Sequence, residues 1–336
     1  MIKVAINGFG RIGRMVLRSI YENKFNNKIK VVAINNKASA DISAFLLQKD
    51  TVHGDFKLKV KNNRDTLFIN KDKIALSNNS EPKECPWKKH KIDIVFECSG
   101  KFNTKSQANG HIKAGAKKVI VSAPCKNADK TIVFGINHKK ITKNDKIISV
   151  ASCTTNCLAP IVLVLNQNFG IEKGYMTTVH AYTSDQRLLD NSHKDLRRAR
   201  SAPNSIVPTS TGAAKSLRII IPEIGNKIDG VSLRVPVPNV SLVQLNFLTK
   251  KIITEKIVNN SFIKASNTNL KNIMGVETMP LVSSDFNHDK RSSIIDLGLT
   301  KVLGGRYGTV FSWYDNEWGF ANRMSDLAIF IKKTLK

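Results

Sequence analysis

One cysteine of the sequence stands where a nucleophile is expected. Cys153 lies in the run S-C-T-T-N-C at 152–157, directly after the strand-like residues 147–150 and at the start of a helix-like stretch. A cysteine in the first turn of a helix meets the positive end of the helix dipole, which favours the thiolate. The neighbouring hydroxyl side chains indicate a polar pocket rather than core. Cys157 lies one helical turn further on; we interpret it as a buried structural cysteine, with a resolving thiol as the alternative.

A glycine pattern near the N-terminus points to a nucleotide. Gly8, Gly10 and Gly13 form G-x-G-x-x-G between a strand-like run at 4–6 and a helix-like run at 13–23. In that context the glycines permit a tight turn and bring the backbone close to a pyrophosphate at the positive end of the helix. A chance glycine-rich turn is the alternative. We therefore predict a dinucleotide-binding unit.

The choice of dinucleotide depends on the end of the second strand. In NAD-binding units this strand normally ends in an acidic residue that bonds the ribose hydroxyls, but here the run is A-I-N-N-K at 33–37. Asn36 cannot repel a 2′-phosphate as a carboxylate would, and Lys37 could attract one. The alternative is that Asn36 bonds the ribose of plain NAD.

The order of elements predicts two domains. The first half alternates short β-branched runs with helix-like stretches, which is typical of βαβ crossovers and a parallel sheet covered by helices on both faces. The second half has longer strand-like runs bracketed by Gly and Pro, which favour a mostly antiparallel sheet. The predicted class is α/β, with an N-terminal Rossmann-type parallel sheet at 1–151 and an α+β catalytic domain at 152–315. Apolar spacing predicts a C-terminal helix within 316–336. We expect this helix to pack back on the first domain.

The charge balance raises a different class of function. The 336 residues contain 53 Lys+Arg against 26 Asp+Glu, a formal net charge of +27, which favours polyanionic partners. The basic residues are spread along the chain beside Asn and Ile, and no nucleic-acid-binding signature accompanies them. We read the charge as compositional drift and expect only weak, non-specific binding to nucleic acid.

Composition also bounds the compartment. Five cysteines without a CxxC pair or a zinc-type array indicate a reducing compartment and no metal site. No run approaches the 18 or so apolar residues of a membrane span, and the sequence opens on a strand rather than a signal peptide. We expect a cytoplasmic protein, or an organelle stroma for a processed chain.

Several motifs, spread over the whole sequence, resemble one family. Their order and spacing are similar to those of phosphorylating glyceraldehyde-3-phosphate dehydrogenase of the bacterial and plastid type. The motifs are N-G-F-G-R-I-G-R at 7–14, S-C-T-T-N-C at 152–157, T-T-V-H at 177–180, H-K-D-L-R-R-A-R at 193–200, T-S-T-G-A-A-K at 209–215, R-V-P-V-P-N at 234–239 and W-Y-D-N-E-W-G at 313–319.

The resemblance implies a reaction of glycolysis and gluconeogenesis. Cys153 would attack the aldehyde of D-glyceraldehyde 3-phosphate, and His180 would be the general base. The thiohemiacetal would give up a hydride to NAD or NADP and leave a thioester, which inorganic phosphate would cleave to 1,3-bisphosphoglycerate. The family also implies a homotetramer in which the loop around 181–205 lines a neighbour's cofactor site.

The resemblance further implies the binding residues. Thr183 and Arg234 would hold the substrate phosphate. The acceptor phosphate would contact residues of three segments, namely Ser152, Thr154, Arg198, Thr211 and Gly212. The cofactor would contact Gly8, Gly10, Arg11, Ile12, Gly13, Asn36, Ser122 and Asn316, the last at the nicotinamide carboxamide. For the arginines at 197, 198 and 200, a solvated basic loop is the alternative, and we expect at least one of them to be only that.

Three departures and two rival functions stay open. Asn36, Asn191-Ser192 and Ser80 differ from the commonest pattern of the family near the adenosine, and they leave the choice between NAD and NADP undecided. Erythrose-4-phosphate dehydrogenase is the nearest rival enzyme, although its loop usually lacks the Thr-Gly that this chain keeps at 211–212. The rival from another class is a nucleic-acid-binding protein without catalysis, motivated only by the charge.

Overall fold

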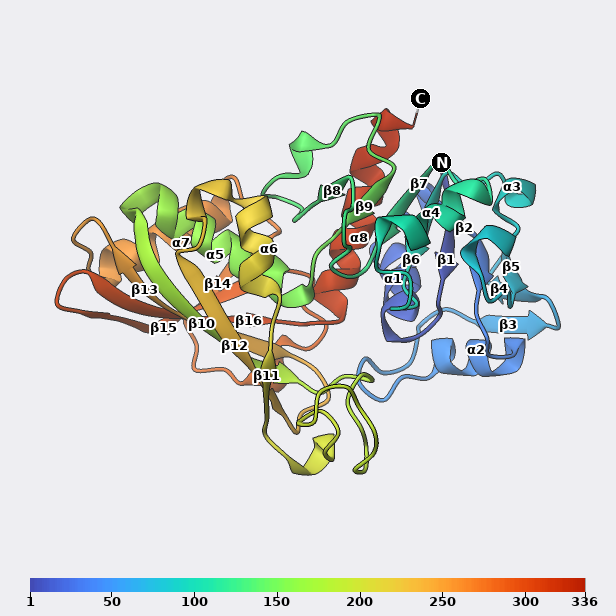
Figure 1. Ribbon diagram of the computed structural model, residues 1–336. Helices are drawn as coiled ribbons and strands as arrows, with labels where there is room; N and C mark the ends of the chain where they lie inside the picture. The colour runs from blue at the N-terminus through green and yellow to red at the C-terminus, as the bar shows by residue number, and fades with distance from the viewer. Residues whose placement is uncertain (336) are drawn as a thin grey trace. The chain divides into compact units, whose positions relative to one another are not determined.

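The computed structural model describes residues 1–335, which divide into two compact units (Figure 1). The first unit contains residues 1–134, 138–151 and the C-terminal residues from Ala321 onward. The second contains 135–137 and 152–320. Within the first unit, the C-terminal helix meets the first helix where Ser325 Oγ lies 3.0 Å from Ser19 Oγ.

The first unit is built on a nine-stranded sheet with the order β3-β4-β5-β2-β1-β6-β7-β9-β8. From β5 to β8 every neighbouring pair is parallel, whereas β3, β4 and β5 pair antiparallel at one edge. The chain leaves β1 toward β2 on one side and later returns to β6 on the other side. This reversal of strand order opens a crevice at the carboxyl ends of β1 and β6, where doubly wound sheets bind their ligands.

The first unit contains nine strands and, among the residues that the structure describes, helices that lie between and after them in sequence. The strands are β1 (Ile2–Asn7), β2 (Ile29–Asn35), β3 (Val60–Asn63), β4 (Thr66–Ile69), β5 (Asp72–Ser77), β6 (Ile94–Glu97), β7 (Lys118–Val121), β8 (Lys130–Thr131) and β9 (Ile147–Ser149), and the helices are α1 (Arg11–Glu22), α2 (Ala40–Gln48), α3 (Trp87–His90) and α4 (Lys105–Lys113). Helix α8 (Trp318–Ile331) begins in the second unit and belongs to the first from Ala321 onward. Gly10 is the N-cap of α1, so the glycine pattern lies at the junction of β1 and α1.

The second unit is built on a seven-stranded sheet with the order β11-β12-β10-β13-β16-β15-β14. Four of its six pairs are antiparallel, and β10·β12 and β14·β15 are parallel. The strands are β10 (Ile171–Ala181), β11 (Val207–Ser210), β12 (Ile228–Val235), β13 (Ser241–Thr249), β14 (Met274–Glu277), β15 (Ser293–Leu303) and β16 (Tyr307–Tyr314), with helices α5 (Cys153–Phe169), α6 (Ala213–Ile220) and α7 (Glu255–Asn267). The predicted fold class, a parallel sheet followed by a mostly antiparallel one, is confirmed.

Two local differences from the sequence expectations have simple causes. The C-terminal helix was expected over most of 316–335, but α8 begins at Trp318 because Asp315 Oδ1 accepts the backbone N–H groups of Glu317 and Trp318 and so caps its start. The antiparallel ribbon of β3, β4 and β5 was not expected. Its strands are only four to six residues long, and β3 is mostly polar (V-K-N-N), so pairing along the edge of the sheet identifies them more clearly than their composition does.

Candidate functional site

The start of α5 presents a thiol beside an imidazole. Ser152 is the N-cap of this helix, and its Oγ accepts the backbone N–H of Thr155 at 3.1 Å, which fixes the first turn. Cys153 is therefore the first helical residue, and it is half-buried. Its Sγ lies 3.4 Å from Nε2 of His180, which is buried near the end of β10. The two predicted catalytic residues are thus brought together from 27 residues apart.

Hydrogen bonding assigns the proton on the His180 ring. Nδ1 lies 2.6 Å from the carbonyl oxygen of Ala181 and 3.2 Å from Nη1 of Arg234, which can only donate. The shorter contact assigns the proton to Nδ1, which donates to Ala181 O, and Arg234 Nη1 donates to the same oxygen at 3.3 Å. Nε2, which faces the thiol, then carries the lone pair in the neutral ring. The imidazole is therefore oriented to accept a proton from the Cys153 side of the site.

Burial shifts the pKa values of both groups toward their neutral forms. Burial raises the pKa of the Cys153 thiol. The positive charge of Arg234 and hydrogen bonds at the start of α5 act in the opposite direction, because they favour the thiolate. Burial and then the charge of Arg234 lower the pKa of His180 to about 3. The imidazole is thus an unprotonated acceptor at neutral pH, while Arg234 supplies the positive charge beside the sulfur.

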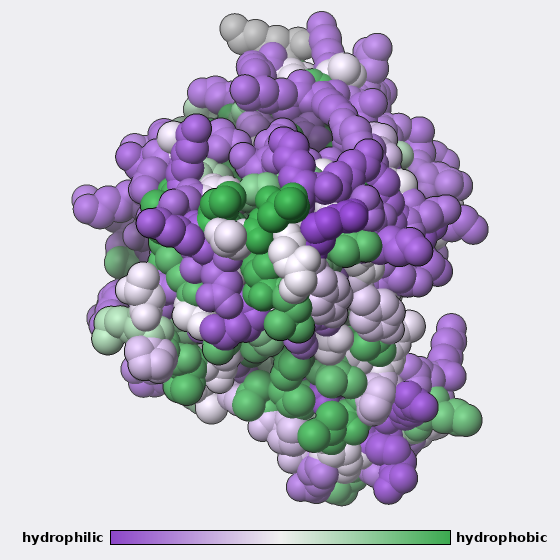
Figure 2. Space-filling model, turned by 90° about the vertical axis from the view of Figure 1, so that its left-hand side faces the viewer, coloured by the Kyte–Doolittle hydropathy of each residue, from purple (hydrophilic) through white to green (hydrophobic). Residues whose placement is uncertain are grey.

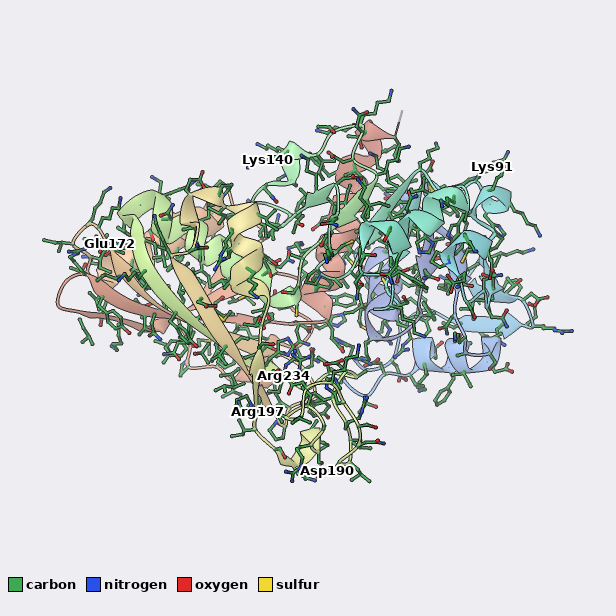
Figure 3. All side chains as sticks on the ribbon, viewed as in Figure 1. Lys91, Lys140, Glu172, Asp190, Arg197 and Arg234 are labelled. Atoms are coloured by element: carbon green, nitrogen blue, oxygen red, sulfur yellow. The ribbon has the colours of Figure 1, made fainter. Side chains whose placement is uncertain are left out.

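Arg234 reaches this pair from the neighbouring strand. It is paired with His180 in the parallel register of β12 and β10, and its guanidinium contacts Ala181 O at 3.3 Å and Thr183 Oγ1 at 3.4 Å. Figure 3 shows Arg234 at the end of β12, and Arg197 and Asp190 in the loop that follows β10. Thr183 and Arg234, the residues expected at a substrate phosphate, therefore lie together beside the thiol–imidazole pair.

A tyrosine behind the thiol was not expected from the sequence. The hydroxyl of Tyr314, which is 1% exposed, lies 2.9 Å from Thr154 Oγ1 and 2.9 Å from Thr178 Oγ1. Thr154, expected at the acceptor phosphate, is itself buried, and its hydroxyl is held by Tyr314. The motif at 313–319 contains the tyrosine, but nothing in the local pattern links it to position 154.

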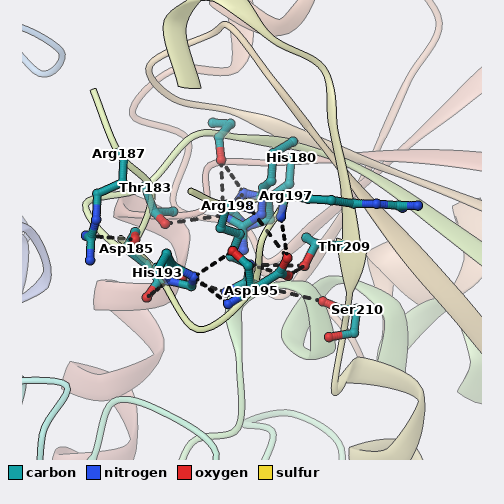
Figure 4. A network of polar contacts seen from close by, with 12 residues as sticks. His180, Thr183, Asp185, Arg187, His193, Asp195, Arg197, Arg198, Thr209 and Ser210 are labelled. Carbon is teal, nitrogen blue, oxygen red and sulfur yellow. Dashed lines mark hydrogen bonds and ion pairs between the residues drawn. The ribbon is translucent and has the colours of Figure 1, made fainter. Parts of the chain in front are cut away.

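Arg198 belongs to a polar network in the loop between β10 and β11 (Figure 4). Its Nε donates to Thr209 Oγ1 at 3.0 Å and one terminal nitrogen donates to Asp185 Oδ2 at 2.6 Å. Thr209 in turn donates to Asp195 Oδ2 at 2.6 Å. Asp185, Asp195 and Thr209 were not predicted as site residues, and no local signal pairs them with Arg198.

The remaining residues of the expected acceptor site lie at the start of α6. Gly212 is the N-cap of that helix, and Thr211 Oγ1 accepts the backbone N–H of Ala213 at 3.2 Å. Arg198 also reaches Ser210 O at 3.4 Å, next to these residues. Arg200 behaves differently, because it is exposed and paired with the exposed Asp190. The structure thus separates Arg198, held toward the site, from Arg200 on the solvated side of the loop.

The glycine turn forms one wall of a hollow in the first unit with a volume of about 260 Å³. Gly8 has a φ of +88°, and a Cβ there would lie 2.5 Å from the backbone of Ser99. A Cβ at Gly13 would lie 2.2 Å from the carbonyl oxygen of Gly8, so both positions require glycine. Gly10 meets nothing within 4 Å, and no side chain caps α1. Open space beside Gly10, at a helix start without a side-chain cap, fits the pyrophosphate of a dinucleotide.

The hollow is lined by polar and basic groups. Asn36 lies in it, bound to the backbone N–H of Phe9 at 3.4 Å and to Ser43 at 3.3 Å. Two lysines, Lys37 and Lys101, line the same space, and no carboxylate does so among the residues that the structure describes.

The other expected cofactor residues are placed as follows. Arg11 is ion-paired with the buried Asp50, and Ile12 is half-buried in the first turn of α1. Ser122 follows β7, where its backbone N–H donates to Glu97 O at 3.0 Å. In the second unit, Asn316 is buried, and its Oδ1 accepts from Ser241 Oγ at 2.8 Å.

A dinucleotide-type crevice in one unit and a cysteine–histidine pair in the other define an oxidoreductase with an NAD-binding domain. Two family models match the chain: "Glyceraldehyde 3-phosphate dehydrogenase, NAD binding domain" at residues 2–105 and "Glyceraldehyde 3-phosphate dehydrogenase, C-terminal domain" at 152–316. The chain belongs to the glyceraldehyde-3-phosphate dehydrogenase family, which confirms the resemblance seen in its motifs.

Curated relatives are similar over nearly their whole lengths. Glyceraldehyde-3-phosphate dehydrogenase of Xanthobacter flavus is 50% identical over 332 residues, covering 99% of each chain. Glyceraldehyde-3-phosphate dehydrogenase 2 of Bacillus subtilis is 50% identical over 336 residues, covering 100% of this chain and 98% of its own. The Pseudomonas aeruginosa enzyme is 48% identical over 328 residues, covering 98% and 97%. Among the described residues, no helix is long and apolar enough to cross a membrane.

Proposed function

We propose that the protein oxidises D-glyceraldehyde 3-phosphate, with inorganic phosphate and NAD+ or NADP+, to 1,3-bisphosphoglycerate in glycolysis and gluconeogenesis. The observation that carries this proposal is the 3.4 Å approach of Cys153 Sγ to His180 Nε2, with the other ring nitrogen bound to Ala181 O. A thiol beside an oriented, neutral imidazole is the arrangement that covalent catalysis on an aldehyde requires.

The steps follow from these two side chains. His180 Nε2 takes the thiol proton as the sulfur attacks the aldehyde carbon, and the proton is returned to the carbonyl oxygen to give a thiohemiacetal. His180 then removes that hydroxyl proton, which makes loss of hydride from the carbon favourable. Bound NAD+ or NADP+ supplies the hydride acceptor. The resulting thioester is cleaved by phosphate, whose oxygen takes the acyl group while the sulfur leaves.

Two groups of residues would hold the two phosphates. Thr183 and Arg234, which contact each other at 3.4 Å beside His180, suit the substrate phosphate. The acceptor phosphate would lie near Arg198 and residues of two helix starts, namely Ser152, Thr154, Thr211 and Gly212. Guanidinium forks, hydroxyls and backbone N–H groups are suitable donors to a tetrahedral dianion.

The cofactor would occupy the hollow beside Gly8. In this proposal the pyrophosphate faces the α1 start, and Asn36 faces the adenosine ribose. Lys37 and Lys101 line the hollow, and no carboxylate is among its described lining residues. This positive charge supports acceptance of NADP as well as NAD. The other proposed contacts are Gly10, Arg11, Ile12, Gly13, Ser122 and Asn316. Because Asn316 Oδ1 accepts from Ser241, its amide nitrogen would donate to the nicotinamide carboxamide.

We propose for the functional division of the chain the bounds that the sequence predicts. We assign residues 1–151 to dinucleotide binding and 152–315 to catalysis, with 316–336 returning to the first domain. The five free cysteines support a reducing compartment such as the cytoplasm.

We further propose a homotetramer. The loop between β10 and β11 exposes Leu188, Leu189, Leu196 and Ile206, at 74%, 73%, 83% and 68%. Exposed apolar side chains on one loop favour burial against a second copy of the chain. Figure 2 shows connected apolar areas on the face that it draws, interrupted by hydrophilic side chains.

One assay tests the reaction and separates its nearest rival. Reduction of NAD+ and NADP+ is followed with glyceraldehyde 3-phosphate, with and without inorganic phosphate. Phosphate-dependent reduction is expected. Equal turnover without phosphate, with erythrose 4-phosphate as the better substrate, would favour erythrose-4-phosphate dehydrogenase instead.

A further inference from the structure

A chain of buried polar side chains crosses the first sheet behind the Gly8 hollow. It runs from His111 on α4 to Glu97 at the end of β6, then to Asn7 at the end of β1 and Asn35 at the end of β2. The successive contacts measure 2.8, 2.6 and 2.8 Å, and all four residues are at most 6% exposed. The chain therefore links three neighbouring strands at their carboxyl ends.

Glu97 is the centre of this chain. Trp87 Nε1, which can only donate, lies 2.9 Å from His111 Nδ1, so the His111 proton is on Nε2 and is donated to Glu97 Oε2. The same oxygen accepts from Asn7, while Oε1 accepts the backbone N–H of Ser99 at 2.8 Å and its hydroxyl at 2.5 Å. The carboxylate thus accepts four hydrogen bonds and donates none.

Its acceptor character fixes the amides that follow. Asn7 must turn its NH2 toward Glu97, which leaves its Oδ1 to accept from Asn35 Nδ2. Asn35 Oδ1 then accepts the backbone N–H of Asn79 at 2.8 Å and Ser77 Oγ at 3.0 Å. Asn7, Asn35, Asn79 and Ser99 all line the hollow.

We propose that Glu97 is a positioning residue that sets the shape of the cofactor hollow through Asn7, Asn35 and Ser99, without touching the cofactor. The proposal rests on the hollow being the NAD site. His111 supports it from the side away from the hollow, since it is fully buried and not among the lining residues.

The test replaces the carboxylate by an amide of the same size. The amide of Glu97→Gln has two possible orientations. In one, its NH2 faces the donors of Asn7 and His111, and in the other it faces the backbone N–H of Ser99. Either way two donors face each other in a buried place, so we expect KM for NAD+ to rise about tenfold or more. The expected kcat stays within about twofold, and alkylation of Cys153 in the free enzyme is unchanged. The exposed Glu84→Gln is the matched control.

A second pair of variants distinguishes loss of the positioning contact from misfolding. His111→Leu removes the donor to Glu97 and should raise KM for NAD+, whereas His111→Gln keeps a donor and should restore it. Unchanged KM in folded Glu97→Gln, or equal effects of His111→Leu and His111→Gln, would overturn the positioning role. If the wild-type enzyme itself shows no saturation by NAD+, the proposed function fails rather than this inference.

A separate hollow of about 460 Å³ lies toward the amino ends of the strands of the same sheet. Its wall is basic: Lys3, Lys30, Lys73, Lys89, His90 and Lys91 line it together with Val32, Thr66 and Ala75. Lys3 and Lys30 are direct neighbours in the register of β1 and β2. Figure 3 labels Lys91, which follows α3.

A carboxylate next to this wall is engaged elsewhere, because Asp93 Oδ2 accepts the backbone N–H of Lys3 and Oδ1 pairs with Lys117. Within residues 1–335, no carboxylate lines the hollow, and its five lysines form no ion pair. Five exposed lysines along one wall make the electrostatic potential of the hollow positive, which favours a bound anion. We infer that the hollow binds a compact polyanion of linked phosphates, at a site separate from the cofactor hollow.

Calorimetric titration with inorganic tripolyphosphate tests this inference, using enzyme saturated with NAD+. Lys30→Gln/Lys73→Gln should weaken binding about tenfold or more at low salt, while the exposed pair Lys57→Gln/Lys59→Gln removes equal charge and should leave it unchanged. A parallel titration with a nucleoside triphosphate distinguishes free phosphate chains from nucleotides. Equal weakening in both double variants would mean that only net charge attracts the anion, and the site would be rejected.

Discussion

Asp185 and Arg198 form an ion pair in the loop between β10 and β11, with 2.6 Å between Oδ2 and a terminal guanidinium nitrogen. The arginine side chain is 21% exposed and the aspartate 54%, so the carboxylate lies on the solvent side of the pair. With Thr209 holding Nε, the guanidinium is fixed in direction before any anion arrives. A phosphate bound by Arg198 would therefore meet a preorganised fork rather than a mobile side chain.

The first prediction concerns that fork. Arg198→Leu should raise KM for inorganic phosphate by about tenfold or more and KM for the aldehyde much less, because a charge-assisted hydrogen bond to the acceptor is lost. Initial rates at varied phosphate and varied aldehyde measure the two constants. Arg200→Leu, on the same loop but exposed and paired with Asp190, is the control and should change neither. Equal rises in both constants would place Arg198 elsewhere in the site.

The second prediction identifies the nucleophile. Cys153→Ser should abolish dehydrogenase turnover, because a serine hydroxyl has almost no anionic form at neutral pH. Iodoacetamide followed by peptide mapping should label Cys153 first. Burial raises the pKa of all three thiols, to about 12 at Cys85 and about 11 at Cys125, but at Cys153 the charge of Arg234 opposes the rise. Cys157→Ser is the control, because it also replaces a thiol of α5 by a hydroxyl, at a buried side chain that donates to Ser312. Faster labelling of Cys85 with retained activity would contradict the assignment.

The third prediction is the rate effect of the base. His180→Asn keeps a polar side chain of similar size but removes Nε2 as a proton acceptor. Turnover should fall by roughly 10²–10⁴-fold, the usual contribution of general acid–base catalysis. Single-turnover measurements of cofactor reduction report this step directly. A loss below about tenfold would show that another group takes the proton.

The fourth prediction follows from the lowered pKa of His180, about 3 against an ordinary 6.5. As pH falls below 6.5 the unfolded chain takes up the proton before the folded one, so stability is full above that pH and is lost toward pH 3. Between pH 7.5 and pH 5 the free energy of unfolding of the wild type should fall by about 2 kcal/mol more than that of His180→Asn. Denaturant unfolding of both proteins at pH 7.5 and pH 5 gives the difference. Parallel losses in the two proteins would mean that His180 is protonated in the fold.

The fifth prediction concerns the choice of cofactor. The native enzyme should accept both NAD+ and NADP+. Asn36→Asp should lower NADP+ use through repulsion of the 2′-phosphate and leave NAD+ use unchanged or improved. The ratio of kcat/KM for the two cofactors is the measurement, and Asn78→Asp, a nearby charge change outside the hollow lining, is the control. Strict use of NAD+ by the native enzyme would show that the departure at position 36 has no effect on specificity.

The sequence alone determined the features that local chemistry controls. Gly8 and Gly13 are required by a tight turn between one strand and the next helix, so their spacing predicted the dinucleotide unit. The alternation of strand-like and helix-like runs predicted the parallel sheet, because a crossover helix lies between parallel strands along the chain. Cys153 was found from its place at a helix start, and the motifs around it identified the family.

Only the tertiary structure decided which distant side chains meet. Tyr314 holds Thr154 from 160 residues away, and Asp185 holds Arg198 across a loop without regular structure. Glu97 and Asn7 meet because β1 and β6 are neighbours in the sheet, and that pairing sets their 2.6 Å contact. Such contacts depend on strand order and register, which bring residues together regardless of their separation in sequence. A local pattern of residue types carries no record of that order, so the directions of these hydrogen bonds could be assigned only after the chain had folded.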